Sequence, residues 1–400
     1  MRRTALAAIV VLVILSSLLS GCGERETPTQ NIIKIGVNLD FTGSASAQCI
    51  GAEHSYQMAI DAINEAGGVR VKGKSYIMQM KTYQTSFTNA EAAAACVRRM
   101  VLQDGLRILF DSTFPGALDT VYPDIIENKV LMFNTFVDES VVVPEHPYSF
   151  RCCLGYKDNQ LVQWKQVIPE LFPGLKKYAF IGYKGQPSNA KYSQLYSASM
   201  NIECLAAETY AYGTTDFSPI ITKVLQLEPE LIEVGGYAAD LANLIKQLRQ
   251  QGYTGAIVGS STIEPAVLMS IAGPEAAEGV YIGSNQAAPT GPFATPAMTE
   301  FYDEYVDKYG KDAWMGLNSN WYSVPYILKQ AIEQADSLET DDIVQALETG
   351  EFSILRSETK VTFGGAETYG IKHQLQVPFF ESQIQNGQLV NLVSVPSVIP

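Results

Sequence analysis

The stretch IIKIGV, residues 32–37, is a short and almost wholly apolar run. Such a run predicts a buried β-strand, because a strand covered on both faces has no polar face to show. A loop with Gly43 follows, and residues 53–66 then carry apolar side chains at helical spacing. Gly67 and Gly68 end that predicted helix, since glycine readily adopts the left-handed conformation found after helices. The chain therefore opens with a strand, a loop and a helix.

The same alternation continues along the chain in two series. The first series has predicted strands at 76–80, 106–110 and 130–133 and predicted helices at 89–103 and 115–128. The second has predicted strands at 177–182, 208–210, 231–236, 256–259 and 279–283, with predicted helices at 192–201, 216–227, 238–251 and 264–271. Asn89 and Asp216 are the expected N-caps. Strands that alternate with helices form parallel sheets covered on both faces, so we predict an α/β fold with two doubly wound lobes.

The remaining chain adds helices and short strands. Residues 299–309, 319–335 and 340–349 have amphipathic helical patterns, whereas 360–363 and 377–380 have strand-like ones. With 400 residues the chain is long enough for two domains.

Residues 1–21 have the features of a secretory signal peptide. Arg2 and Arg3 precede an apolar run that is shorter than the roughly 20 residues of a membrane-spanning helix. Leu19-Ser20-Gly21-Cys22 resembles the lipobox of bacterial lipoproteins, in which the thiol of Cys22 is acylated and becomes the new N-terminus. The alternative is an ordinary signal peptide or membrane anchor that happens to contain a cysteine. The lipobox predicts an extracytoplasmic protein that is tethered to the membrane by lipid, with residues 22–30 as a polar linker.

The net charge and the cysteines of the chain bear on what it can bind and on which disulfides it can form. The formal net charge is −14 and the pI is near 4.8, and basic stripes for phosphate binding are missing from the sequence, so nucleic acid is not expected as a partner. Cys49, Cys96, Cys152, Cys153 and Cys204 follow the lipobox. Their odd number predicts at least one thiol that is free or paired outside the chain, and a Cys152–Cys153 bridge or a bridge from either of them to Cys204 stays open.

Several segments together resemble a known family. IKIGV at 33–37, Thr42-Gly43 and AINEAGGV at 62–69 are similar to the opening of type I periplasmic solute-binding proteins, in the leucine/isoleucine/valine-binding branch. GTTDFS at 213–218, GGY at 235–237 and GPEAAEG at 273–279 are similar to later parts of the same family. The resemblance implies two lobes joined by three crossovers, which close over a small solute and deliver it to an ABC transporter permease.

The resemblance also implies where the lobes divide. Residues 31–150 and about 285–355 would form lobe 1, and residues 151–284 and about 356–400 would form lobe 2. The crossovers are expected near Phe150-Arg151, Ser284-Asn285 and Leu355-Arg356.

Ligand residues follow from the same resemblance and from the ends of the predicted strands. In the family, hydroxyl side chains after the third strand bind the ligand's carboxylate, and here that stretch is Ser112-Thr113-Phe114. Val137 and Asp138 align with a backbone carbonyl and a threonine of the family, and Ser261 aligns with an acidic residue. The predicted ligand-binding set is Gln48, Ser112, Thr113, Phe114, Asn134, Phe136, Val137, Asp138, Tyr183, Tyr237 and Ser261.

Structural roles compete with some of these assignments. Ser112 and Thr113 could cap a loop, Asp138 could be an N-cap, and Tyr237 could pack in a core or a hinge. If the assignments hold, the aromatic members enlarge the lining of the cleft and Asp138 faces an amine. The expected ligand is then a small carboxylate solute, an amino acid or a close derivative.

Catalysis and metal binding are not expected. The sequence has no G-x-S-x-G nucleophile motif and no phosphate-binding loop, and His54, His146 and His373 lack metal-ligand spacing. We therefore predict a binding protein with no cofactor and no metal. A sensor that docks onto a membrane signalling receptor is the alternative to transport.

Overall fold

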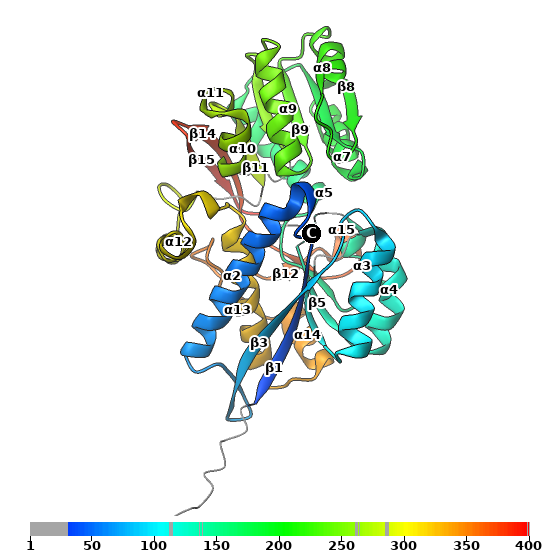
Figure 1. Ribbon diagram of the computed structural model, residues 1–400, viewed down its shortest axis with the longest axis vertical. Helices are drawn as coiled ribbons and strands as arrows, with labels where there is room; N and C mark the ends of the chain where they lie inside the picture. Colours follow the sequence, from blue (N-terminus) through cyan, green and yellow to red (C-terminus); the bar gives the residue numbers. More distant parts are fainter. Residues whose placement is uncertain are drawn as a thin grey trace, which may run out of the picture.

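The computed structural model describes residues 31–397 and 399, apart from 112–114, 136, 138, 261–262, 264 and 285–287. Two β-sheets, each flanked by helices, form two lobes that lie end to end (Figure 1). The predicted α/β fold with two doubly wound lobes is confirmed.

The sheet of lobe 1 has eight strands in the order β12-β13-β6-β5-β4-β1-β3-β2. Its strands are β1 (Ile32–Leu39), β2 (Val69–Val71), β3 (Lys74–Gln84), β4 (Ile108–Asp111), β5 (Leu131–Asn134), β6 (Ser149–Arg151), β12 (Phe363–Gly364) and β13 (Gln374–Leu375). The opening strand β1 lies inside the sheet, parallel to β3 on one side and to β4 on the other. Ile33, Ile35 and Val37 are buried there, as the apolar run predicts.

Helices cover both faces of this sheet. Figure 1 shows α2 (Ser46–Glu65) and α13 (Asn318–Ala335) on one face, and α3 (Ala90–Arg98) and α4 (Pro115–Glu127) on the other. The other helical segments of lobe 1 are η1 (Gly43–Ala45), η2 (Arg99–Gln103), η3 (Glu139–Val141) and α14 (Thr340–Thr349). Asn89 caps α3 as predicted, because its side chain accepts a hydrogen bond from the N–H of Ala92 at 3.0 Å.

The sheet of lobe 2 has seven strands in the order β15-β14-β11-β10-β9-β7-β8. Its strands are β7 (Lys177–Tyr183), β8 (Glu203–Tyr210), β9 (Leu231–Gly235), β10 (Ala256–Gly259), β11 (Tyr281–Ser284), β14 (Phe379–Gln385) and β15 (Gln388–Val395). Strands β7 to β11 run parallel, and the hairpin β14–β15 adds an antiparallel edge.

Short and long helices surround the second sheet. They are α5 (Tyr156–Val162), η4 (Gln163–Val167), α6 (Ile168–Leu171), α7 (Pro187–Ser199), α8 (Ser218–Leu225), α9 (Ala238–Gln250), α10 (Pro265–Ala272) and α11 (Pro274–Ala277). The remaining helical segments of the chain are α12 (Pro296–Tyr309), η5 (Lys311–Ala313) and α15 (Ala366–Tyr369). The expected N-cap Asp216 is wrong by one residue, since Phe217 stands at the N-cap of α8 and Asp216 accepts the N–H of Ser218 at 2.9 Å.

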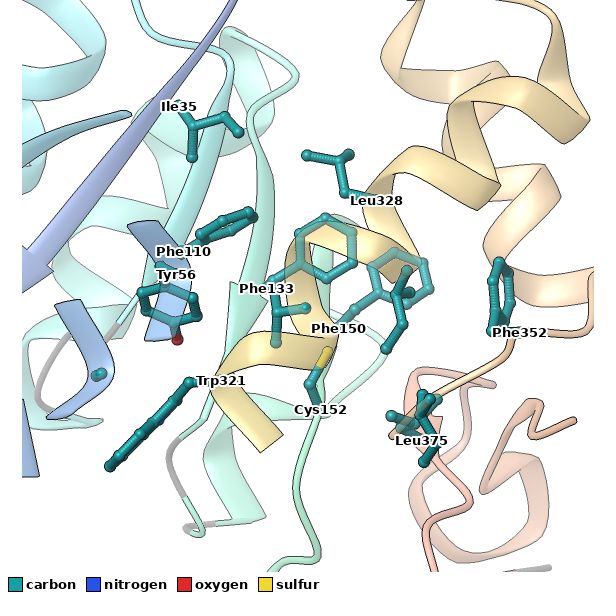
Figure 2. Packing of buried hydrophobic residues seen from close by; sticks show 14 of the residues in the cluster. Ile35, Tyr56, Phe110, Phe133, Phe150, Cys152, Trp321, Leu328, Phe352 and Leu375 are labelled. Carbon is teal, nitrogen blue, oxygen red and sulfur yellow. The ribbon is translucent and has the colours of Figure 1, made fainter. Parts of the chain in front are cut away.

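An aromatic row crosses the core of lobe 1 (Figure 2). Phe110, Phe133 and Phe150 come from the neighbouring strands β4, β5 and β6, with successive ring centroids 6.0 and 6.4 Å apart. Phe363 of β12 continues the row, 5.1 Å from Phe150. All four rings are buried, so the row packs the segment that contains β12 against the centre of lobe 1.

The strand pairing bears on where the chain passes from one sheet to the other. Strand β6 ends at Arg151 in the first sheet and α5 begins at Tyr156 in lobe 2, where the first crossover was expected. The third crossover is not at Leu355-Arg356, because β12 and β13 still pair in the first sheet. The chain reaches the second sheet only at β14, so the predicted boundary is about 20 residues too early. The strand-like pattern at 360–363 overlaps β12, but a local pattern does not say which sheet a strand joins, and this explains the error.

A buried arginine at the first crossover contacts the segment that precedes the third. Arg151 is completely buried, and its guanidinium lies 3.1 Å from Asp158. The same side chain donates to Gln374 at 2.5 Å, so the segments that lead into lobe 2 share one anchor.

The described residues also bear on the expected disulfides and on membrane-spanning helices. Cys49, Cys96, Cys152, Cys153 and Cys204 form no disulfide, so neither of the bridges left open by the sequence is present. No helix among these residues has the length and apolar character to cross a bilayer. The leader, Cys22 and the linker lie outside the described residues.

Candidate functional site

The carboxyl ends of the two parallel sheets face each other. Gly43 follows β1 in lobe 1, and a Cβ atom built on it would lie 2.5 Å from the hydroxyl oxygen of Tyr212, which follows β8 in lobe 2. Tyr237, which follows β9, belongs to the buried apolar cluster of lobe 1 together with Cys49. Loops at the carboxyl ends of parallel strands are where such folds bind ligands, so the interlobe region is the candidate site.

Tyrosines from lobe 2 form one wall of this region. The ring centroids of Tyr183, Tyr212 and Tyr237 lie 5.4 to 6.0 Å apart in tilted or edge-to-face contacts. Tyr210 lies behind them, 6.3 Å from Tyr183, and donates a hydrogen bond to the carbonyl of Gly235. Burial raises the pKa of Tyr183 and Tyr237, so both hydroxyls stay protonated near neutral pH and can donate hydrogen bonds.

The opposing surface of lobe 1 is built on the turn after β1. Asp40 is buried there and organises the turn, because its carboxylate accepts the backbone N–H groups of Thr42 and Phe87 at 2.9 and 2.8 Å. Cys49 lies under this turn, and burial raises the pKa of its thiol to about 12. A thiol in that state is not a nucleophile, since the thiolate is the reactive form.

The N-terminus of α2 opens on the same surface. Its N-cap residue, Ala45, makes no side-chain hydrogen bond, and the first turn holds no acidic residue. Gln48 in this turn is half-buried, and its Oε1 has no hydrogen-bond partner among the described residues. The turn η1 runs directly into α2, and the N–H of Ser46 donates to the carbonyl of Gly43, so the positive end of this helical segment lies at η1. Such an end suits an anion.

A carboxylate of lobe 1 contacts lobe 2 elsewhere along the region. Glu139, at the start of η3, accepts hydrogen bonds from Tyr192 and from Ser188, the latter at 3.5 Å. Lys191 lies 3.4 Å from the same carboxylate. All three partners belong to α7, so Glu139 spans the two lobes.

The predicted ligand residues divide into two groups. Ser112, Thr113, Phe114, Phe136, Asp138 and Ser261 lie outside the described residues. Gln48, Asn134, Val137, Tyr183 and Tyr237 are described, and each lies at or just after the carboxyl end of a strand or in the first turn of α2. Asn134 is fully buried at the end of β5, and the carbonyl of Val137 already accepts the N–H of Tyr156 at 2.8 Å.

Two residues of the candidate site were not predicted from the sequence. Tyr212 stands two residues beyond β8, beside Gly213, and Glu139 stands next to Asp138. A strand end followed by a glycine could have indicated Tyr212. The pairing of Glu139 with α7 joins segments about 50 residues apart, and no local pattern encodes it.

The histidines and tryptophans have structural surroundings. His54 stacks on Tyr309 at 3.8 Å, His146 on Tyr122 at 3.7 Å and His373 on Phe150 at 3.8 Å. Within the described residues no group of three or more His, Cys, Asp or Glu side chains could hold a metal ion. Trp321 and Tyr322 are buried, and Trp314 packs on Phe301 and Tyr302.

Known proteins share this sequence pattern and this fold. A family model described as a periplasmic binding protein matches residues 32–388. A protein of Brucella melitensis, named Leu/Ile/Val-binding protein homolog 3, is 24% identical over 368 residues, which cover 90% of this chain and 93% of that protein.

Two solved structures show the same architecture. A branched-chain amino acid transporter substrate-binding protein of Streptococcus pneumoniae, in complex with isoleucine, has a TM-score of 0.76 and 20% identity. The matched region covers 92% of this chain and all of that one. A solute-binding protein of R. palustris, in complex with benzoate, has a TM-score of 0.77 and 13% identity, with 92% and 98% covered.

Proposed function

The chain belongs to the periplasmic binding protein family, and from this membership we propose that it captures a small carboxylate solute outside the cytoplasm and delivers it to an ABC transporter permease. It is a binding protein and not an enzyme. Its acylated Cys22 holds it at the membrane surface.

The observation that carries the proposal is the pairing of the α2 N-terminus with the tyrosine wall. The amino-terminal turns of α7 and α9 already face carboxylates, because Glu139 contacts α7 and Asp240 lies in the first turn of α9. The first turn of α2 has no acidic residue of its own. A solute carboxylate can therefore bind at this end of α2, beside Gln48.

The neighbouring strand supports the same position. β4 lies next to β1 in the sheet, so the carboxyl end of β4, which Ser112 and Thr113 follow in the sequence, lies beside the end of β1 that leads to α2. Hydroxyl groups from that loop add donors for the carboxylate. Asp138 faces the amine of the solute, and the solute is an amino acid or a close derivative.

The tyrosine wall sets the rest of the specificity. Tyr183, Tyr212 and Tyr237 give an apolar surface with hydroxyl donors at its edge, which accepts an aliphatic or aromatic side chain. The relatives named above bind or are named for branched-chain amino acids and benzoate, which share a carboxylate and an apolar body.

Binding closes the lobes around the solute by a hinge at the crossovers. The Arg151–Asp158 pair lies at this hinge and keeps the crossover segments together while the lobes rotate.

A thermal-shift panel tests the proposal. The mature protein is heated with amino acids, amides, aromatic acids and polyamines, each in excess. A solute at 100 times its Kd stabilises the folded protein by about 2.7 kcal/mol, so a ligand raises the melting temperature. We expect the shift with carboxylate solutes. A shift only with polyamines, or with no member of the panel, would contradict the proposed ligand class.

A further inference from the structure

Three donors of α7 converge on one carboxylate of the opposite lobe. Ser188, Lys191 and Tyr192 stand at positions i, i+3 and i+4 of the helix, which places them on one face. Glu139 reaches this face from η3 in lobe 1 and contacts all three.

The surroundings of the contact make it more than a surface ion pair. Tyr192 is 6% exposed and Ser188 is 8% exposed, so their hydroxyl groups are largely removed from water. The side chain of Glu139 is 35% exposed and that of Lys191 is 62% exposed. A hydrogen bond from a shielded hydroxyl to a carboxylate is stronger than an exposed ion pair, so Tyr192 contributes more than Lys191.

The position of Glu139 near the N-terminus of α7 adds a second favourable interaction, with the helix dipole. The first turn of α7 holds no acidic residue of its own, and its N-cap residue Gln186 makes no side-chain hydrogen bond. Glu139 thus brings negative charge near the positive end of a helix of the other lobe.

We propose that Glu139 is an internal closing ligand, whose contact with Tyr192, Lys191 and Ser188 holds the two lobes together in the absence of solute. The carboxylate of Glu139 binds near the N-terminus of α7, just as the carboxylate of the solute is proposed to bind near the N-terminus of α2. Rotation of the lobes apart breaks these bonds, because Glu139 and its three partners lie on opposite sides of the hinge. The inference rests on the proposed hinge closure and on no particular solute.

The contact also limits how a solute uses α7. Tyr192 and Ser188 already donate to Glu139, so a solute that recruits either hydroxyl has to displace this carboxylate. Tyr183, Tyr212 and Tyr237 therefore remain the tyrosines of lobe 2 that are available for solute contact.

Interlobe distances in solute-free protein test the proposal. Spin labels are attached at Glu91→Cys in α3 and Lys184→Cys after β7, both exposed and on different lobes. Cys204 is half-exposed and is replaced by serine, whereas the other four described cysteines are buried. Pulsed electron-spin resonance then measures the populations of short and long distances.

We expect a major short-distance population in the starting protein. Glu139→Gln should lower the closed-to-open ratio about tenfold, the effect of losing one charge-assisted hydrogen bond. Tyr192→Phe keeps the ring and should act similarly, whereas Lys191→Met should lower the ratio only about two- to fivefold. Glu145→Gln, an exposed carboxylate on the same connection, is the matched control and should change nothing.

Two results would overturn the inference. One is a solute-free protein that is open in the starting sequence. The other is an unchanged distance distribution in both Glu139→Gln and Tyr192→Phe. Since no solute is added, either result leaves the solute-binding proposal to be judged by its own thermal-shift panel.

Discussion

Gly43→Ala is expected to weaken solute binding by holding the lobes apart. The new Cβ would lie 2.5 Å from the hydroxyl oxygen and 3.1 Å from a ring carbon of Tyr212, so one of the two has to move. Tyr212 cannot swing freely, because its ring contacts Tyr183 and Tyr237 at 6.0 and 5.4 Å. Overpacking costs about 1–3 kcal/mol, and we take about 1–2 kcal/mol here since a side-chain tip gives way partly.

This cost arises only when the lobes are closed. Closure is coupled to solute binding, so the apparent affinity should fall by a factor of about 5–30. Titration calorimetry with a solute that the thermal-shift panel identifies measures the change, and the spin-label distances measure closure directly.

Gly105→Ala is the matched control. Gly105 has φ +67°, close to the φ of +64° at Gly43, and no atom lies within 4 Å of its Cβ position. Both variants carry the cost of a left-handed alanine, about 1–2 kcal/mol of folding stability. Only Gly43→Ala should lose affinity. Equal affinities in the two variants, or an equal loss in both, would refute the steric argument.

Three further predictions concern other groups. Glu381 is buried, neither of its carboxylate oxygens has a partner among the described residues, and burial together with the charge of Glu233 raises its pKa well above the ordinary value. The stability that protonated Glu381 contributes is thus complete below about pH 4.3 and is lost as the pH rises through the raised pKa. Glu381→Gln should therefore reduce the fall in melting temperature between mildly acidic and alkaline pH. Parallel curves of melting temperature against pH for the two proteins would count against this prediction. Asp138→Asn should weaken an amine-bearing solute by about 2–5 kcal/mol in calorimetry, and unchanged affinity would remove the amino-acid assignment. Cys22→Ser should release the protein from the membrane fraction, which an unaltered fractionation would contradict.

Local sequence patterns determined the α/β class, the two strand–helix series and many of their elements. The apolar run at 32–37 became the inner strand β1, and Asn89 became the cap of α3, because burial pattern and capping act over a few residues. The sequence also placed Tyr183 and Tyr237 near the carboxyl ends of strands, since strand ends follow from the strands themselves, and their role as ligand residues stays a prediction.

Tertiary structure alone decided features that join distant segments. β12 and β13 are two residues long and pair with the first sheet, and the strand-like pattern at 360–363 could not show which sheet it joins, so the third crossover was placed too early. The contact of Gly43 with Tyr212 and the contact of Glu139 with α7 depend on how one lobe meets the other. A sequence pattern reports how a residue sits in its own helix or strand. Which residue it meets across a cleft is set by the packing of the two lobes, and that is a property of the whole chain.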